Sequence, residues 1–585
     1  MKFRVSLAQI NPTAGDLRGN AGKILEGIAR AREEKCDLVA FPEMALTGYC
    51  LDEKLLISRD FLAENRRLLM EEILPASEGI AVITGFVDFD EGHTGPGRQI
   101  IRYNAAAVMQ AGRLLQIVHK RLLPAYRYFD DKRYFTAGTE AVPVEIRTSE
   151  GTLPIGVLIC EDLWEEGYDF KPCAAYCEKG ARYLFSINAS PFVGSHPGKQ
   201  DGKRFVRAEL IQKQIARYGI PVLYLNTVGV GDNGKNVIPF DGMSVVYDAK
   251  GRLVASLRQF AEEQQTVCLE EGEGAAIEDS PFDREEEIFQ ALVMGVKDYY
   301  DKLGFFKGVL QTLSGGIDSA LGTVIAFEAV GRELLSAYNL PSRYNSEETQ
   351  RLARELAENL GLEYHVVPIQ GMVDRVVEDF EKYLRPFWSP VTAENLQARI
   401  RGLIMMAESN DRGALLLTNG NETEIALGYA TLYGDMAGGL SVIGDLNKPD
   451  VYALARHANR RRGRELIPEG VFRQQPSAEL RPEQVDPFDY EVVGPIVSAF
   501  VESGCGPEDL AADFKKKRLS REVAPLGEEI YTRYTPEQFR ELVHDLFGRL
   551  NRSVYKRLQG APIIVVSERA FGFDLRESII NGWTG

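Results

Sequence analysis

The segment Leu313–Ala320, which reads LSGGIDSA, constrains the fold more than any other part of the chain, because it directly follows the apolar run 308–312. Its two glycines let backbone N–H groups approach a phosphate closely, and a helix beginning near Asp318 would add its positive N-terminal end. A strand, a glycine loop and a helix in this order predict a layered α/β domain with a pyrophosphate-binding loop. A glycine-rich turn without a ligand is the alternative, and Asp318 and Ser319 at this spacing favour the phosphate loop.

The loop differs from the other common phosphate loop, which requires Gly-Lys followed by Ser or Thr. None of the pairs Gly22-Lys23, Gly198-Lys199 and Gly234-Lys235 continues in that way. The sequence therefore predicts transfer of AMP, with pyrophosphate as the leaving group, rather than transfer of a γ-phosphoryl group.

Length and charge limit the class of protein. A chain of 585 residues is long enough for two to four domains. Its 68 Lys and Arg against 85 Asp and Glu give a net charge of −17, which argues against nonspecific binding to nucleic acid or to an anionic membrane. There is no apolar run of signal-peptide or membrane-span length, and the seven dispersed cysteines form no disulfide framework. We expect a cytoplasmic protein without nucleic-acid or membrane partners.

Short apolar runs alternate with helix-like stretches in the first part of the chain, which predicts sheets covered by helices. The predicted strands are 5–10, 38–41, 81–87, 155–159, 184–187 and 222–225, with two more around a turn in 243–253. A composition rich in Glu, Gln and Gly then marks a boundary. We predict a first domain at 1–265, a linker at 266–285 and a second domain at 286–585. In the second domain the β/α alternation resumes and predicts a doubly wound parallel sheet.

A cysteine, a carboxylate and a lysine each follow a strand-like run in the first domain. Cys160 ends the run 153–159, where we expect it to face solvent, and Glu43 and Lys120 follow Phe41-Pro42 and His119. Taken alone, such a cysteine is more often a small buried hydrophobe, and a lone lysine is usually solvated. Together they fit nucleophilic catalysis, because a thiol with a pKa of about 8.5 needs a base and a nearby cation at neutral pH.

These three segments, in this order and separation, resemble the nitrilase superfamily. The resemblance implies a four-layer αββα sandwich that hydrolyses an amide through a Glu-Lys-Cys triad. Glu43 would be the general base and Cys160 the nucleophile that forms a thioester. Lys120 and the backbone N–H of Glu161 would stabilise the oxyanion.

The first domain is similar, more narrowly, to the glutaminase domains that are fused to synthetases. Tyr126, Ser190 in the segment NASPF, and the run 224–229 match segments that line the glutamine pocket in that branch. Lys199 is the third implied glutamine contact, although it lies nine positions after Ser190 where the family places a basic residue six positions after. The GxGxxG match at 229–234 predicts no dinucleotide site, because a proline and a further strand follow it where a helix is required.

The second domain resembles the NAD synthetase family along nearly its whole length. Beside the phosphate loop, the matching segments are 394–401, 420–429, 431–435, 476–480, 556–557 and 570–572. The resemblance implies that ATP adenylates the nicotinate carboxylate of deamido-NAD and that ammonia then displaces AMP, giving NAD.

The same resemblance implies the residues of this second site. The predicted ATP contacts are Leu313, Ser314, Gly315, Gly316, Ile317, Asp318, Ser319 and Asn419. The predicted deamido-NAD contacts are Asn395, Arg399, Glu424, Asp435, Lys448 and Lys556. Mg²⁺ would be held by Asp318 and Glu424. Two positions depart from the family pattern: Asn419 stands where a threonine is usual, and Glu422 where a basic residue is usual.

Two complete sites on one chain predict an enzyme that releases ammonia from L-glutamine and consumes it in the second domain, through a buried passage. One alternative is an ammonia-dependent synthetase with a non-catalytic first domain. Another is a different amidotransferase with the same pyrophosphate loop, such as a tRNA-modifying or purine-forming ligase. The resemblance also implies a homo-oligomer, a dimer or larger.

Overall fold

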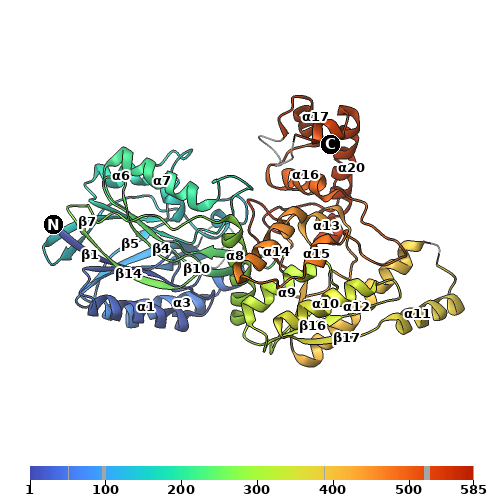
Figure 1. The fold of residues 1–585 in the computed structure, drawn as a ribbon. Coiled ribbons are helices and arrows are strands. Elements are labelled where there is room, and N and C mark those ends of the chain that lie inside the picture. The colour runs from blue at the N-terminus through green and yellow to red at the C-terminus, as the bar shows by residue number, and fades with distance from the viewer. Residues whose placement is uncertain (50–51, 95–99, 388, 520–527, 584–585) are drawn as a thin grey trace. The chain divides into compact units, whose positions relative to one another are not determined.

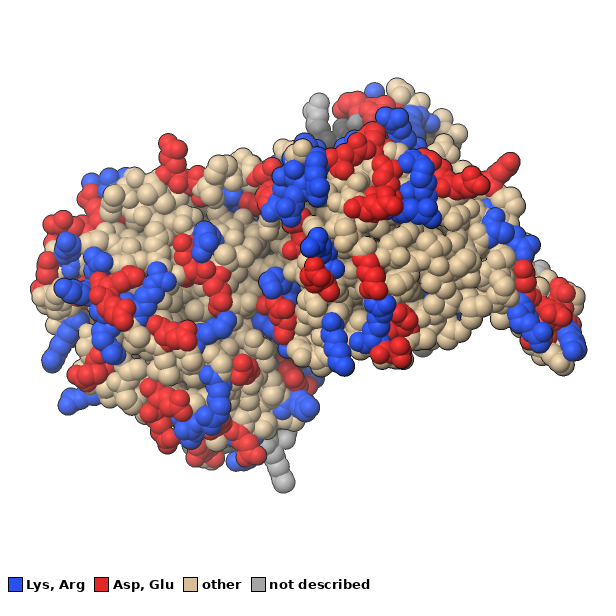
Figure 2. Space-filling view, turned by 60° about the horizontal axis from the view of Figure 1, so that its bottom comes forward, with Lys and Arg blue, Asp and Glu red and all other residues tan. Residues whose placement is uncertain are grey.

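The computed structural model describes residues 1–49, 52–94, 100–387, 389–519 and 528–583 (Figure 1). The chain divides into two compact units. The first contains Met1–Asn233 and Ile238–Phe282, and the second contains Gly234–Val237 and Asp283–Gly585. None of the described helices is both long enough and apolar enough to cross a bilayer. Figure 2 shows acidic and basic side chains interspersed over the visible face rather than gathered by sign.

The first unit contains two six-stranded sheets. One sheet has the strand order β14 (Glu263–Glu270), β1 (Lys2–Gln9), β2 (Leu38–Ala40), β3 (Ala81–Thr94), β4 (Ile100–Gln110) and β5 (Arg113–His119). The other has the order β13 (Leu253–Ser256), β12 (Val245–Tyr247), β9 (Val222–Asn226), β8 (Tyr183–Asn188), β7 (Gly151–Ile159) and β6 (Val144–Thr148).

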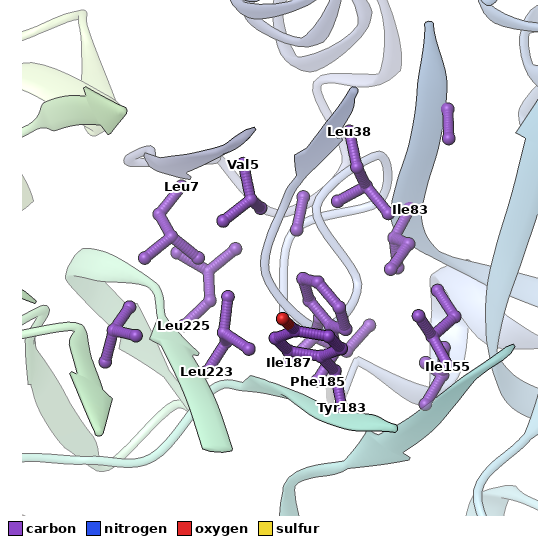
Figure 3. Packing of buried hydrophobic residues seen from close by; sticks show 14 of the residues in the cluster. Val5, Leu7, Leu38, Ile83, Ile155, Tyr183, Phe185, Ile187, Leu223 and Leu225 are labelled. Atoms are coloured by element: carbon purple, nitrogen blue, oxygen red, sulfur yellow. The ribbon is translucent and has the colours of Figure 1, made fainter. Parts of the chain in front are cut away.

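The central strands of both sheets, such as β8 and β9, are buried on both faces, which explains why they read as apolar runs. In β1, Val5 and Leu7 point toward the other sheet, and in β8 Phe185 and Ile187 point back toward them (Figure 3). The intervening residues, such as Leu184, face the helices. The core between the sheets is therefore built from alternate residues of each strand.

Helices cover the outer face of each sheet. The helices α1 (Leu17–Glu33) and α3 (Arg59–Leu68), with the π-helical turn Leu69–Ile73, bury one apolar face against the first sheet. The helices α6 (Pro172–Glu178) and α7 (Lys203–Tyr218) do the same on the second sheet. This order of helix, sheet, sheet and helix is the predicted αββα sandwich.

The structure continues the first unit beyond the predicted end at residue 265. Strand β14 pairs antiparallel with the whole of β1, from Lys2 opposite Glu270 to Gln9 opposite Glu263. Because β14 is an edge strand, only part of its surface is buried, and its Glu- and Gln-rich composition is tolerated there. The unit ends at Phe282, so most of the expected linker 266–285 belongs to the first unit.

The second unit is built on a parallel sheet. Its strands are β15 (Val309–Thr312), β16 (Leu335–Asn339), β17 (Glu363–Val366), β18 (Leu415–Thr418), β19 (Leu440–Ser441) and β20 (Ile563–Ile564). The order β20-β19-β18-β15-β16-β17 shows that the chain starts at β15, builds outward to β17 and then returns to the other side of β15. This reversal between β15 and β18 is a topological switch point, where α/β sheets bind ligands.

Helices flank this sheet and extend beyond it. They are α8 (Arg284–Leu303), α9 (Ile317–Val330), α10 (Glu347–Leu360), α11 (Gln370–Tyr383), α12 (Pro390–Arg412), α13 (Glu422–Leu427), α14 (Lys448–Arg462), α15 (Glu469–Arg473), α16 (Tyr490–Glu502), α17 (Pro507–Lys515), α19 (Ile530–Arg533), α20 (Pro536–Arg552) and α21 (Val554–Arg557). Apolar faces of α13, α16, α17 and α20 share a separate helical core. The doubly wound fold is confirmed, with this added layer of helices.

A four-residue segment from the first half of the chain belongs to the second unit. Asn236 and Val237, at the start of β11 (Asn236–Asp241), pair in parallel with Ile563 and Ile564. The fully buried Asn236 amide donates to Phe571 O at 2.8 Å, and its Oδ1 accepts from the N–H groups of Phe573 and Asp574 at 2.8 and 3.1 Å. Asn236 thus satisfies three backbone groups of the C-terminal segment.

We expect Asn236→Ala to lower the free energy of unfolding by about 2–4 kcal/mol, because three buried backbone groups lose their partner. Urea denaturation or calorimetry would measure this. Asn551→Ala is the matched control, since its amide makes one exposed hydrogen bond to Trp583 O, and we expect a change within about 0.5 kcal/mol. Equal effects of the two changes would contradict the anchoring role of Asn236.

Candidate active sites

Cys160 lies at a sharp turn after β7. It begins the short 3-10 helix Cys160–Leu163 with a φ of 48°, in the left-handed region that residues other than glycine rarely adopt. Cys160 is only 5% exposed, so the prediction that its thiol faces solvent is wrong. The turn places the thiol in a closed polar site rather than in the apolar core.

Lys120 is buried between two carboxylates. Its Nζ donates to Glu43 Oε1 at 2.8 Å and to Asp131 Oδ2 at 2.7 Å, and all three side chains are at most 1% exposed. Glu43 and Lys120 therefore meet as predicted. Asp131, the first residue of α5 (Asp131–Tyr134), was not predicted, because no motif marks it.

Glu43 is held by three hydrogen bonds. Oε1 accepts from Lys120 and from Asn104 Nδ2 at 2.7 Å, and Oε2 accepts from the N–H of Ala189 at 2.7 Å. The turn that carries Glu43 packs directly on β3 at Gly85, where a Cβ would lie 2.2 Å from the backbone nitrogen of Met44. The carboxylate is therefore fixed in place before any substrate binds.

Asp162 joins the turn that carries Cys160 to the segment after Lys120. Its Oδ1 accepts from the N–H groups of Arg121 and Leu122, each at 2.9 Å, and its Oδ2 pairs with the Arg121 guanidinium at 3.0 Å. Asp162 also accepts from the N–H of Ile159 at 3.2 Å. This buried carboxylate therefore sets the spacing between nucleophile and lysine, and sequence motifs gave no sign of it.

The charges of the site set the protonation of its members. Burial alone would lower the pKa of Lys120, but Asp131 and Glu43 raise it well above its ordinary value, so the lysine stays charged. Burial, and then the charge of Glu43, raise the pKa of Cys160 well above its ordinary value. The resting site therefore favours a neutral thiol near a charged ammonium.

The predicted substrate-side residues are only partly brought together. The Tyr126 hydroxyl donates to Glu161 Oε2 at 2.9 Å. Ser190 is 2% exposed, and its backbone carbonyl accepts from Arg207 at 2.8 Å. Lys199 is exposed on the loop before α7, and the structure shows no contact of it with this site.

A second lysine, which the sequence analysis did not single out, acts on the thiol of Cys160. Lys203, the first residue of α7, lies 4.0 Å from the centroid of the Trp164 ring, and its charge acts on the Cys160 thiol. Burial lowers the pKa of Lys203 to about 8. The signal that could have found it is a further Gly-Lys pair, Gly202-Lys203, four residues after the one considered in the sequence.

The phosphate loop has the predicted geometry. It follows β15, and α9 begins at Ile317. Gly315 has a φ of +94°, and a Cβ there would lie 2.1 Å from Thr349 O, so only glycine fits. Ser319 Oγ accepts from the N–H of Ser314 at 3.2 Å and lies 3.1 Å from Ser314 Oγ, which closes the loop.

Asp318, Glu424 and Lys448 meet beside this loop, at the switch point of the sheet. Lys448 Nζ pairs with Asp318 and lies 3.6 Å from Glu424 Oε1. Asn421 donates its Nδ2 to Asp318 Oδ1 at 3.2 Å and caps α13, which carries Glu424. Burial, and then the charge of Asp318, raise the pKa of Glu424 to about 8.

This arrangement fits a divalent cation. The raised pKa of Glu424 indicates that a second negative charge beside Asp318 is disfavoured, and a divalent cation between the two carboxyl groups would relieve that repulsion. The described residues contain no group of three or more His, Cys, Asp or Glu side chains that could hold a metal ion. Two carboxylates suffice for Mg²⁺, which usually takes its other ligands from substrate phosphates and water.

The other predicted contacts gather on the segment after α13. Thr431 donates to Asn395 Oδ1 at 2.8 Å and, from its N–H, to Asp435 Oδ1 at 2.7 Å. Lys556 Nζ donates to the carbonyls of Gly428 and Ala430, each at 2.8 Å, and Arg399 Nε donates to Leu432 O at 3.2 Å. The structure thus places these four predicted residues around 428–435.

The two departures from the family pattern have different surroundings. Asn419 follows β18 and donates to Thr312 Oγ1 at 2.8 Å, so it links the ends of β18 and β15 beside the loop. Glu422 is 2% exposed, accepts from Ser498 Oγ at 2.9 Å, and burial raises its pKa well above the ordinary value. Glu422 therefore points into the protein, where burial favours its neutral form.

Comparison with protein families agrees with this division of the chain. The family described as Carbon-nitrogen hydrolase matches residues 4–273, and the family described as NAD synthase matches residues 288–536. The fold and the two sites define a two-domain enzyme that combines these families.

Similarity to individual proteins extends over the whole chain. The glutamine-dependent NAD(+) synthetases of Thermotoga maritima and Synechocystis are 37% and 34% identical to it, over 99% of this chain and 99% and 98% of theirs. A solved glutamine-dependent NAD+ synthetase from Acinetobacter baumannii, in complex with ADP, is 30% identical, with a TM-score of 0.74 and coverage of 100% of this chain and 99% of its own. The chain belongs to the family of glutamine-dependent NAD(+) synthetases.

We expect iodoacetamide to alkylate Cys160 slowly at neutral pH and faster above pH 9, because its pKa lies above the ordinary value of 9.0. In Glu43→Gln the profile should move down by about 1 to 3 pH units, since a negative charge that raises the pKa is removed. Peptide mass spectrometry measures the labelling, with the exposed Cys268 as internal reference. An unchanged profile in Glu43→Gln would contradict the coupling.

Proposed function

We propose that this chain forms NAD from deamido-NAD, ATP and L-glutamine, releasing glutamate, AMP and pyrophosphate. The observation that carries the proposal is that each unit brings together the residue types that its reaction needs. Lys120 and Glu43 lie beside a strained Cys160 in the first unit, and a pyrophosphate-type loop lies beside Asp318 and Glu424 in the second.

In the first site, Glu43 takes the thiol proton as Cys160 attacks the side-chain carbonyl of glutamine. Lys120 and the N–H of Glu161 stabilise the oxyanion. Ammonia leaves, and water hydrolyses the thioester to glutamate. Tyr126, Ser190 and a basic residue would hold the amino-acid end of glutamine. The basic residue would be Lys199 or Lys203, because a lysine suits the carboxylate of glutamine.

In the second site, the nicotinate carboxylate of deamido-NAD attacks the α-phosphorus of ATP, and the 314–319 loop receives the leaving pyrophosphate. Leu313 to Ser319 and Asn419 would bind ATP. Asn395, Arg399, Glu424, Asp435, Lys448 and Lys556 would face deamido-NAD. Ammonia then displaces AMP from the adenylate.

Mg²⁺ bound by Asp318 and Glu424 would neutralise charge on the phosphates. The chain's own contribution is to hold these two carboxylates close together through Lys448 and Asn421.

An ammonia-dependent enzyme with a non-catalytic first domain fits less well. Burying an ammonium between two carboxylates costs free energy, and a docking module has no need of such a buried charge. A different amidotransferase with the same loop would be distinguished by product analysis with deamido-NAD against other carboxylate acceptors.

Cys160→Ala should abolish NAD formation from glutamine and leave NAD formation from ammonia within about twofold, because only the nucleophile of the first site is lost. Steady-state rates with each nitrogen donor measure this. Glu424→Gln is the reciprocal control and should stop NAD formation from both donors while basal glutamine hydrolysis continues. Equal loss of both activities in Cys160→Ala would contradict the division of labour.

We propose that ammonia passes between the sites without equilibrating with solvent, since most ammonia is protonated at neutral pH and then cannot attack. An added ammonia-scavenging enzyme should leave glutamine-driven NAD formation largely intact while it suppresses formation from added ammonium. Complete loss of glutamine-driven NAD formation would refute the passage.

We also propose that the enzyme acts in the cytoplasm as a homo-oligomer. The dispersed, odd-numbered cysteines support a reducing compartment. Light scattering would measure the oligomeric state.

A further inference from the structure

Lys448 occupies a position that its own backbone disfavours. It is the first residue of α14, where the positive end of the helix dipole opposes a cation, and its side chain is only 4% exposed. Asp318 and Glu424 attract the ammonium on one side. On the other side, the centroid of the Tyr490 ring lies 5.0 Å from Nζ, within reach of a cation–π contact.

The Tyr490 ring is itself held by a carboxylate. Its hydroxyl donates to Asp486 Oδ2 at 2.9 Å, and Tyr490 is 6% exposed at the start of α16. The other oxygen of Asp486 accepts from the Tyr429 hydroxyl at 3.0 Å. One carboxylate therefore fixes two tyrosines.

Tyr429 links this group of contacts to the backbone of Glu424, whose side chain is one of the two metal-site carboxyl groups. Its N–H donates to Glu424 O at 2.9 Å, directly after α13. Gln484 Nε2 donates to the Tyr429 hydroxyl at 3.2 Å, and Phe488 packs edge-on against both Tyr429 and Tyr490. The contacts thus form a closed ring from Glu424 through Tyr429, Asp486 and Tyr490 to Lys448 and back.

We propose that Asp486 and Tyr490 are positioning residues for AMP transfer: they hold the Lys448 ammonium beside Asp318, Glu424 and the phosphate loop. The proposal rests on the proposed function of the second site. Neither residue needs to touch substrate. Their effect passes through Lys448, which serves both as a charge aimed at the phosphates and as a competitor of a divalent cation for the two carboxylates.

The test compares Tyr490→Phe, Tyr490→Leu and Asp486→Asn with wild-type enzyme, using ammonia as nitrogen donor so that the first site is not involved. Tyr490→Phe keeps the ring but loses the hydroxyl that bonds to Asp486. Asp486→Asn keeps one acceptor oxygen, whereas the hydroxyls of Tyr429 and Tyr490 need two. Each change should lower kcat about 10- to 100-fold, while the KM for ammonia changes less than about threefold. Tyr338→Phe is the matched control, since its hydroxyl also donates to a carboxylate, Glu408, at 2.7 Å.

Mn²⁺ binding without nucleotide, followed by electron paramagnetic resonance, supplies the second readout. In Tyr490→Leu the loosened lysine competes less well, so Mn²⁺ should bind about threefold more tightly or better even though kcat falls. A merely structural role would weaken both. Unchanged kcat in Tyr490→Phe, or weaker Mn²⁺ binding in Tyr490→Leu, overturns the proposal. If wild-type enzyme forms no NAD from either ammonia or L-glutamine, the proposed function fails, whereas the Mn²⁺ comparison still tests the positioning role.

Discussion

The buried ammonium of Lys120 is the constraint on which the first site depends. Removing such a charge from water costs several kcal/mol unless carboxylates compensate for it, so Glu43 and Asp131 must both lie against it. The segments after β2 and β5 and the start of α5 are thereby fixed to one another. Burial, and then the charge of Glu43, raise the pKa of the Cys160 thiol, which favours its protonated form until a substrate carbonyl accepts the attack.

The second site also places one lysine against two carboxyl groups, but the two carboxyl groups are more accessible. Lys448 also lies against two carboxylates, but Asp318 and Glu424 are 18% and 17% exposed, whereas Glu43 and Asp131 are fully buried. In the buried first site, the charge of Glu43 acts on the thiol of Cys160. The more accessible carboxyl groups of the second site fit a divalent ion together with the phosphates of a nucleotide, because the ion would relieve the repulsion between Asp318 and Glu424. Accessibility and the presence of a thiol together separate the two chemistries.

Local features of the sequence predicted much of this molecule. Strands buried on both faces, such as β1, β8 and β9, read as apolar runs, and the LSGGIDSA loop needs only its glycines and the helix that follows. Asp131 and Asp162 escaped prediction because their roles arise from hydrogen bonds between segments that no motif connects. Strand β4 was also missed, since its pairing depends on partner strands rather than on composition.

The boundary between the units shows most clearly where composition and fold diverge. Polar β14 looks like a linker but completes a sheet, because an edge strand buries only part of its surface. Conversely, Gly234–Val237 lies within the first half of the sequence but belongs to the second unit. In a fragment that begins after Phe282, β20 would lose its pairing with β11. The backbone groups that bond to Asn236 would also lose their partner. The second unit is therefore not a contiguous domain, and its fold requires a strand that the first half of the chain supplies.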